Sequence, residues 1–304
     1  MDVYLVQPRG FCAGVRRAID IVHKILQEYG APIYVRHEIV HNKHVIENLK
    51  SQGVIFVEEL EEVSDKTRPV IFSAHGVSEK IKKQAQELKL NVIDATCPLV
   101  NAIHQKIKKL EKDNANIIVI GKETHPEIQG TLGQLSNPQI AHVINKISDI
   151  ERLTINNSKA LGVVTQTTLS VDDTKDIMDA LRKKFSSSKD KYSNICFATT
   201  NRQKAVQELA NKTKNIIIIG SKNSSNSTNL KNAAVKYGAE KAWLIDDVSE
   251  VDWGALDKCQ TIGVSAGASA PDYLVDELIT ALRTRYDNIN IHDVIVTEEN
   301  THFK

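Results

Sequence analysis

The sequence predicts an α/β fold made of three repeated modules with small, mostly parallel sheets. Short apolar runs alternate with amphipathic helical patterns along the 304 residues, which is typical of parallel α/β units. Three apolar runs lead to a cysteine just before a helical pattern, at Cys12, Cys97 and Cys196. Polar residues recur at similar intervals after each cysteine. The resulting repeat of roughly a hundred residues is too long for a solenoid and has the size of a small domain.

Each module offers two further polar positions, and each of these follows another apolar run. The first lies 29, 28 and 29 residues after the cysteine, at His41, His125 and Ser225. The second is found at His75, Thr167 and Ser269. Ligands collect at the carboxyl ends of parallel strands. Three modules that face inward would therefore surround one central cavity with these positions.

The predicted elements follow one another as strand and helix. In the first module they are strands at 3–6, 33–35, 54–57 and 69–72 and helices at 15–26, 43–52 and 79–90. In the second they are helices at 99–112 and 127–135 and strands at 117–120, 141–144 and 161–164. In the third they are helices at 201–213, 227–237 and 272–285 and strands at 216–219, 242–245 and 261–264.

Boundaries between modules are expected near Cys97 and in the polar run at 185–191. The three modules are then residues 14–96, 97–192 and 193–286. Residues 1–13, which carry the first strand and the first cysteine, are expected to join the third module. Residues 287–304 predict a final strand with a frayed tail.

Composition argues against several classes of protein. Apolar residues are 41% and charged residues 25% of the chain, the balance of a folded globular protein. The net charge is only +1, so no basic field favours nucleic acid as a partner. The first residues do not form a signal peptide, and no apolar run approaches the length of a membrane span. We expect a cytoplasmic monomer with no membrane or nucleic-acid partner.

The cysteine pattern favours a metal centre. The cytosol keeps thiols reduced, so four distant cysteines are poor candidates for disulfides. They include no C-x₂-C pair of the kind that binds zinc. One thiolate from each module suits an iron–sulfur cluster in which one iron lacks a protein thiolate, and a helix N-terminus would lower each thiol's pKa. Each cysteine alone could equally be a small buried apolar residue. Cys259 has no counterpart in the other modules and is interpreted as structural.

The third module also carries a candidate anion site. Four polar residues of this module follow strands and precede helices: Ser224, Ser225, Asn226 and Ser269. At such positions hydroxyls, amides and a helix N-terminus can bind phosphate. Such residues alone are also common in turns. His41 and His75 could add hydrogen bonds and, if protonated, positive charge.

A candidate proton donor stands in Thr124-His125-Pro126-Glu127. A carboxylate just after a strand and beside a histidine can donate a proton if a cavity raises its pKa. The alternative is an ordinary glutamate at a helix start, favoured by the helix dipole. Thr167 could link this carboxylate to a substrate hydroxyl, or could be a plain turn residue.

Several motifs together resemble one known family very specifically over about residues 1–285. They are Pro8-Arg9-Gly10-Phe11-Cys12-Ala13-Gly14-Val15, Ser73-Ala74-His75-Gly76-Val77, Asp94-Ala95-Thr96-Cys97-Pro98, His125-Pro126-Glu127, Thr165-Gln166-Thr167-Thr168-Leu169-Ser170, Ala198-Thr199-Thr200-Asn201-Arg202-Gln203, Gly220-Ser221-Lys222-Asn223-Ser224-Ser225-Asn226-Ser227 and Ala266-Gly267-Ala268-Ser269-Ala270-Pro271. The family they resemble is the 4-hydroxy-3-methylbut-2-enyl diphosphate reductases (LytB/IspH) of isoprenoid biosynthesis.

This resemblance implies a trefoil of α/β modules around a 4Fe-4S cluster held by Cys12, Cys97 and Cys196. It implies Glu127 as the proton donor. It also implies contacts to the diphosphate or the hydroxymethyl end of the substrate from His41, His75, His125, Thr167, Ser224, Ser225, Asn226 and Ser269. The implied reaction is two-electron removal of the allylic hydroxyl, with electrons from a ferredoxin or flavodoxin, to give isopentenyl and dimethylallyl diphosphate.

Three other functions remain open from the residues. A cluster-dependent dehydratase also uses an open iron on a hydroxyl but consumes no electrons. A binding or sensor protein would use the cluster only as a structural or redox element and would show no turnover. A phosphate-binding α/β protein without metal would be colourless after anaerobic purification.

Overall fold

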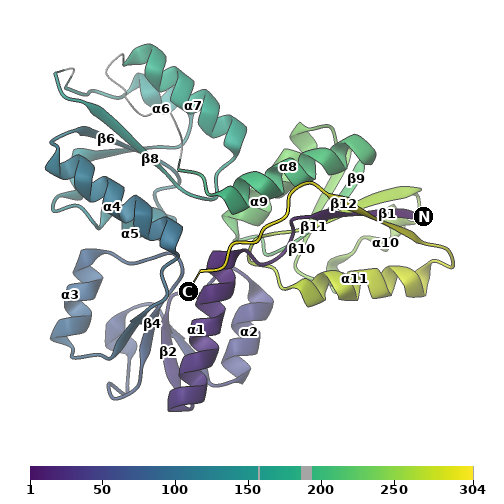
Figure 1. Ribbon diagram of the computed structural model, residues 1–304, viewed down its shortest axis with the longest axis horizontal. Coiled ribbons are helices and arrows are strands. Elements are labelled where there is room, and N and C mark those ends of the chain that lie inside the picture. The colour runs from purple at the N-terminus through teal and green to yellow at the C-terminus, as the bar shows by residue number, and fades with distance from the viewer. Residues whose placement is uncertain (157, 186–193, 304) are drawn as a thin grey trace.

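Three parallel sheets, each covered by helices, surround the centre of the molecule (Figure 1). The computed structural model describes residues 1–156, 158–185 and 194–303. Every strand pairing within these residues is parallel. The predicted α/β class with small parallel sheets is confirmed.

The first sheet has the strand order β3-β2-β4-β5. Its strands are β2 (Ile33–Arg36), β3 (Val54–Val57), β4 (Val70–Phe72) and β5 (Val92–Asp94), and its helices are α1 (Ala13–Tyr29), α2 (Lys43–Ser51) and α3 (Glu79–Glu87). One face of α1 buries Ala18, Val22 and Ile25, which recur at helical spacing. These side chains pack with Ile33 and Val35 of β2 in one apolar cluster. Burial of this face therefore fixes α1 against the sheet.

The second sheet has the order β7-β6-β8. Its strands are β6 (Asn116–Ile120), β7 (Ala141–Ile144) and β8 (Leu161–Thr165), and its helices are α4 (Pro98–Lys112), α5 (Pro126–Leu132), α6 (Ile147–Glu151) and α7 (Val171–Lys184). The helices α6 and α7 are not among the predicted elements. The signals for α7 are nevertheless local: Ser170 caps its first turn by accepting a hydrogen bond from the Asp173 amide. Its buried residues Ile177, Met178 and Leu181 cover this sheet.

The third sheet has the order β10-β9-β11-β1-β12 and joins both ends of the chain. Its strands are β1 (Asp2–Gln7), β9 (Asn215–Ile219), β10 (Lys241–Ile245), β11 (Thr261–Ala266) and β12 (Asn290–Ile295), and its helices are α8 (Phe197–Lys212), α9 (Ser225–Lys236), α10 (Trp253–Leu256) and α11 (Asp272–Arg285). The strand β1 pairs with β11 on one side and β12 on the other. The predicted boundary at residues 192–193 lies outside the described residues, and the division into modules stays a prediction.

The structure corrects the prediction at Cys196. The helix α8 begins at Phe197, four residues earlier than the predicted start at Asn201, and Cys196 is its N-cap. The pattern places Cys196, like the other two cysteines, at a strand-to-helix junction, but residues 194 and 195 are irregular. The third cysteine therefore reaches its position from a loop rather than from a sheet.

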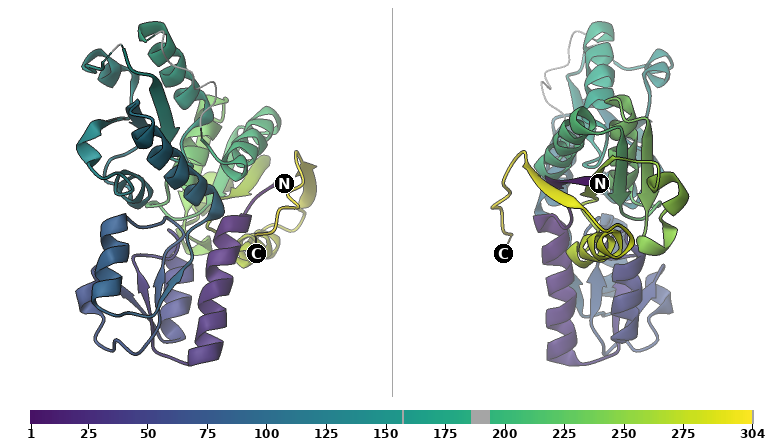
Figure 2. Two further views of the ribbon diagram at one scale, coloured as in Figure 1. Left: turned by 60° about the vertical axis from the view of Figure 1, so that its left-hand side comes forward. Right: turned by 90° about the vertical axis from the view of Figure 1, so that its right-hand side faces the viewer.

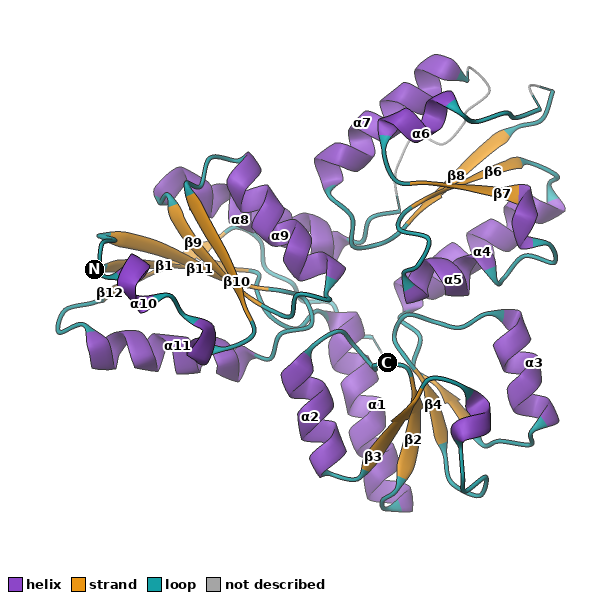
Figure 3. Cartoon of the chain, turned by 180° about the vertical axis from the view of Figure 1, so that it is seen from behind, coloured by secondary structure: helices purple, strands orange, loops and turns teal. Residues whose placement is uncertain are grey.

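The carboxyl ends of all three sheets point toward the centre, so the loops that follow the strands gather there (Figures 2 and 3). The C-terminal segment after β12 runs back to the same region and ends near the start of α1 (Figure 1). No helix in residues 1–156, 158–185 and 194–303 has the length and apolarity needed to cross a membrane.

His104 of α4 gives the fold an acid-sensitive point. Its side chain is buried and covers Gly76, where an added Cβ would come within 2.6 Å of the ring. Burial, with help from Lys82 and Lys108, lowers the pKa of His104 from 6.5 to about 4. Between about pH 6.5 and pH 4, His104 is therefore protonated in the unfolded chain but neutral in the folded chain.

We therefore expect stability to fall as the pH drops from 6.5 toward 4, and His104→Leu to remove part of this loss. Between pH 7 and 4.5, the free energy of unfolding should fall by about 2 kcal/mol less in the variant than in the parent. Urea titrations of the metal-free protein at both pH values measure it, with His23→Leu on α1 as the control. Equal acid losses in His104→Leu and the parent would contradict this role.

Candidate functional site

A cavity of about 110 Å³ lies where the three sheets meet. All twelve predicted site residues line it: Cys12, His41, His75, Cys97, His125, Glu127, Thr167, Cys196, Ser224, Ser225, Asn226 and Ser269. They come from all three sheets, and most stand in loops directly after parallel strands. Residues far apart in sequence thus share one site, as the spacing of the motifs predicts.

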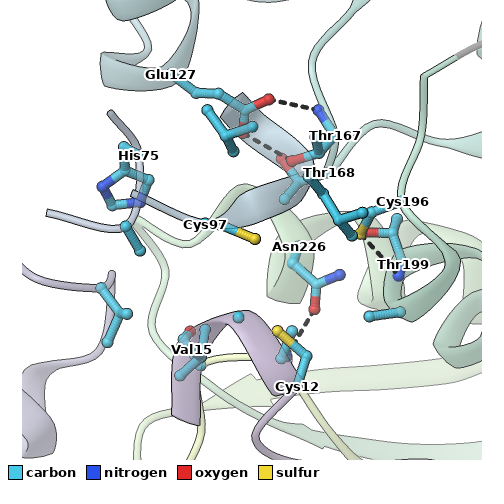
Figure 4. Close-up of a pocket in the computed structure, with 18 of the residues that line it drawn as sticks. Cys12, Val15, His75, Cys97, Glu127, Thr167, Thr168, Cys196, Thr199 and Asn226 are labelled. Atoms are coloured by element: carbon cyan, nitrogen blue, oxygen red, sulfur yellow. Dashed lines mark hydrogen bonds between the residues drawn. The ribbon is translucent and has the colours of Figure 1, made fainter. Parts of the chain in front are cut away.

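The three cysteines each stand at the N-cap of a helix, Cys12 before α1, Cys97 before α4 and Cys196 before α8. Their sulfur atoms point toward the same central space (Figure 4). Cys196 Sγ accepts a hydrogen bond from the Thr199 amide at 3.3 Å. The site thus offers three soft sulfur donors, each beside the free amides of a first helical turn.

The pKa values of two thiols differ from the prediction. Burial raises the pKa of Cys97 to about 12 and that of Cys196 to about 11, and the nearby Cys12 raises both further. The helix N-termini and hydrogen bonds act in the opposite direction, but desolvation is larger. These thiols would stay protonated by themselves at neutral pH. A bound metal would deprotonate them, because a coordinating thiol loses its proton to the cation.

Three thiols in one cavity provide the ligand type that holds iron–sulfur clusters. Within the described residues, no three cysteine, histidine or acidic side chains lie close enough together to hold a single metal ion. A single zinc would need all its sulfurs about 2.3 Å from one point. Thiolates that bind different irons of one cluster stand farther apart. Gly14 leaves room for Cys97, because a Cβ there would come within 2.6 Å of Cys97 Sγ.

Glu127 is a buried carboxyl group with two hydrogen bonds, both from Thr167. The Thr167 amide donates to Oε1 at 2.7 Å, and the Thr167 hydroxyl donates to Oε2 at 2.8 Å (Figure 4). Burial raises the pKa of Glu127 to about 7, although both hydrogen bonds lower it. A carboxyl group with this pKa can give up a proton near neutral pH, which an ordinary surface glutamate cannot.

Three histidines form a second wall of the cavity. The rings of His41 and His75 stack with 4.2 Å between centroids, and His125 meets them edge-on at 5.5 and 5.9 Å. Burial lowers the pKa of His75 well below its usual value and that of His125 to about 4. His75 and His125 are therefore neutral in this site at neutral pH and act as hydrogen-bonding groups rather than as cations.

The third sheet supplies a polar wall around the start of α9. Ser224 caps the helix by accepting a hydrogen bond from the Ser227 amide, and Ser269 donates to the carbonyl oxygen of His41. Asn226 Oδ1 accepts from the Ala268 amide at 2.8 Å, while its Nδ2 is buried with no hydrogen-bond partner in the described residues. An unpartnered buried donor is costly unless a ligand accepts from it. This amide therefore marks a ligand position.

Two further groups that sequence reasoning did not assign also line the cavity. Thr168 donates to Ser225 Oγ at 3.0 Å, and Thr199 contacts Cys196. Both stand inside motifs already quoted, which was the available signal. Phe303 of the C-terminal tail reaches the same cavity and had no signal of this kind. Cys259 lies away from it and contacts the apolar cluster of the third sheet.

Known proteins are similar to this chain in sequence and in fold. A family profile described as LytB protein matches residues 3–283. A relative from Ruegeria pomeroyi is 46% identical over 305 residues, covering 100% of this chain and 96% of its own length. One from Escherichia coli O6:K15:H31 is 47% identical over 289 residues, covering 93% of this chain and 88% of its own. Both carry the name 4-hydroxy-3-methylbut-2-enyl diphosphate reductase.

Solved structures agree with the sequence relatives. The E-1-hydroxy-2-methyl-but-2-enyl-4-diphosphate reductase from Plasmodium falciparum superposes with a TM-score of 0.93 at 37% identity, covering 98% of this chain and 93% of that one. A second structure, of (E)-4-hydroxy-3-methyl-but-2-enyl diphosphate reductase, has a TM-score of 0.67 at 29% identity and covers 93% and 99%. The chain therefore belongs to the LytB protein family.

Proposed function

We propose that this protein reduces (E)-4-hydroxy-3-methylbut-2-enyl diphosphate to isopentenyl and dimethylallyl diphosphate. Two electrons and two protons enter, the C–O bond of the allylic alcohol breaks, a C–H bond forms and water leaves. The names of its relatives support this reaction. The single observation that carries it is a buried carboxyl group with a raised pKa in the same cavity as three thiols.

The thiols of Cys12, Cys97 and Cys196 would hold a 4Fe-4S cluster in this account. Such a cluster, when bound, supplies electrons one at a time and an iron without a thiolate that can act as a Lewis acid on the hydroxyl. The electron donor is a ferredoxin or flavodoxin in this proposal. The protein's own contribution is to exclude water and orient the substrate around this group.

The diphosphate would bind at the start of α9. Its anionic oxygens would accept hydrogen bonds from the unpartnered Asn226 amide and from nearby hydroxyls, helped by the positive end of the helix dipole. The neutral ring of His75 and the ring of His41 that stacks on it add further donors from the histidine wall. The chain therefore binds the anion through several separate donors.

Glu127 would deliver the proton that turns hydroxide, a poor leaving group, into water. Its raised pKa keeps the carboxyl group partly protonated at neutral pH, and Thr167 fixes its orientation with two hydrogen bonds. His125 stands at the N-cap of the same helix, with its Nδ1 accepting from the Glu127 amide. We propose that Thr167 and His125 orient the carboxyl group toward the hydroxymethyl end of the substrate.

Turnover with and without a low-potential electron donor tests this function. The protein is purified without oxygen and mixed with the allylic diphosphate, and products are measured by chromatography. We expect both isomeric products only when the donor is present. Turnover without electrons would favour a dehydratase, and a coloured protein with no turnover under either condition would favour a sensor.

The pH profile of turnover should depend on Thr167. Because Glu127 must be protonated, the rate should fall as the pH rises past about 7. Thr167→Val removes the hydroxyl that stabilises the charged carboxylate, so the pKa of Glu127 rises and the fall should move to higher pH by roughly one unit. Thr168→Val removes a neighbouring hydroxyl that does not contact Glu127 and should leave the fall in place. An unmoved profile in Thr167→Val would contradict this coupling.

A further inference from the structure

Arg202 of α8 is a buried cation that links the first turn of α8, which follows Cys196, to the loop that precedes Cys12. Its side chain is only 1% exposed. Its Nε and Nη2 donate to the carbonyl oxygen of Gly10 at 3.1 and 2.8 Å, and its Nη1 donates to that of Ala198 at 3.0 Å. Gly10 stands two residues before Cys12, and Ala198 stands two residues after Cys196. One guanidinium group therefore spans the backbone beside two of the three thiols.

The loop before Cys12 depends on this link. It has no regular structure. The Gly10 amide donates to the carbonyl oxygen of Ala266 at the end of β11, and the Cys12 amide donates to that of Ala268 just after it. Gly10 has a φ of +67°, and a Cβ there would come within 2.3 Å of Asp272 Oδ1. Its peptide is thus held on one side by β11 and on the other by Arg202. The link to Arg202 sets the position of this loop relative to α8.

The charge of Arg202 is balanced by the C-terminal tail. Glu299 receives hydrogen bonds from Arg202 Nη1 at 3.0 and 3.2 Å and from Asn201 Nδ2 at 3.0 Å, and its side chain is only 14% exposed. A buried cation with no partner is strongly destabilising, so Glu299 is needed to keep Arg202 in place. The tail continues to Phe303, which lines the site cavity and the neighbouring cavity that contains Arg202. The tail after β12 is therefore tied to the thiol side of the site.

We propose that Arg202 and Glu299 form a positioning pair that holds the loops of Cys12 and Cys196 at the separation needed to bind one cluster. This inference rests on the proposed function, because it assumes that these thiols hold iron. Neither residue ligates the metal or touches the substrate in this account. Arg202 acts through the backbone of Gly10 and Ala198, and Glu299 acts through the charge of Arg202.

The test measures iron retention in Arg202→Lys and Glu299→Gln. A lysine offers one nitrogen in place of the three with which Arg202 reaches Gly10, Ala198 and Glu299. Glutamine keeps the size of Glu299 but removes its charge. The proteins are purified without oxygen, and the rate of iron transfer to a ferrous chelator is followed well below the unfolding temperature of each. Outer-shell changes typically cost about 10- to 100-fold in metal affinity, so we expect iron to leave at least about tenfold faster in both variants.

Matched controls separate positioning from simple stability. Arg36 is also a buried arginine, with Glu59 3.6 Å away, and the cavity that it lines contains none of the three cysteines. Arg36→Lys and Glu59→Gln should lower the melting temperature of the metal-free protein without raising the rate of iron loss. If Arg202→Lys does not fold, Glu299→Gln alone decides the question.

Three outcomes would overturn the inference in different ways. A parent protein that holds iron, together with Arg202→Lys and Glu299→Gln proteins that release it at the parental rate, would refute the positioning role alone. Faster release in the Arg36 and Glu59 controls to the same degree would refute it too, because the effect would then follow general stability. A parent protein that holds no iron would overturn the cluster proposal and this inference with it.

Discussion

Replacing Glu127 by glutamine is expected to lower turnover about 10²- to 10⁴-fold, because general-acid catalysis contributes that much. The amide cannot deliver the proton that the leaving hydroxide needs. It keeps the size of the carboxyl group and can still accept from the Thr167 amide, so the fold should persist. Iron content and the visible spectrum should match those of the parent. Steady-state rates with saturating electron donor measure the effect.

Glu123→Gln is the control for this experiment. Glu123 is an exposed carboxylate on the loop that precedes α5 and does not line the cavity. It should turn over at the parental rate. A Glu127→Gln protein that is as fast as the parent would remove Glu127 from the mechanism, whereas one that is slow and has also lost its iron would make it a structural residue.

The loss of turnover should be larger still when one thiol of the cavity is removed. Cys97→Ser replaces a soft sulfur by a hard oxygen with a far higher pKa, and the cluster should lose one of its three protein ligands. We expect the protein to be nearly colourless after anaerobic purification, with turnover below detection. Cys12→Ser and Cys196→Ser should behave in the same way.

Cys259→Ser provides an internal comparison in the same chain. Cys259 packs against the third sheet away from the cavity, and its thiol donates to the Ala255 carbonyl oxygen. This variant should keep its colour, its iron and its turnover. If Cys97→Ser and Cys259→Ser retained iron equally, the three cavity thiols would not be its ligands.

Much of the fold follows from local patterns in the sequence. The strand from Val54 to Val57 has the predicted bounds, and the helix at Lys43–Ser51 differs from its prediction by one residue. Two of the errors, at α7 and before Cys196, have different causes. The helix α7 has a recognisable N-cap at Ser170, so its absence from the prediction is an error of interpretation. The irregular backbone before Cys196 could not be foreseen, because a short apolar run is equally compatible with a strand.

The membership of the site was also predictable, and its electrostatics were not. The regular spacing of the motifs predicts that distant side chains line one cavity, because the carboxyl ends of parallel strands lie at one edge of a sheet. The raised pKa values of Cys97 and Cys196 depend on how deeply the folded chain buries them. The unpartnered amide of Asn226 and the pairing of Arg202 with Glu299 are likewise contacts made only after folding. Local sequence carries no record of them.

Iron and acid-labile sulfide in the anaerobically purified protein test the central claim most directly. Three thiols around one cavity should hold a cluster with about four iron atoms and four sulfides per chain, and the protein should be brown. A folded, colourless protein without iron or sulfide, even after reconstitution with both, would contradict the account.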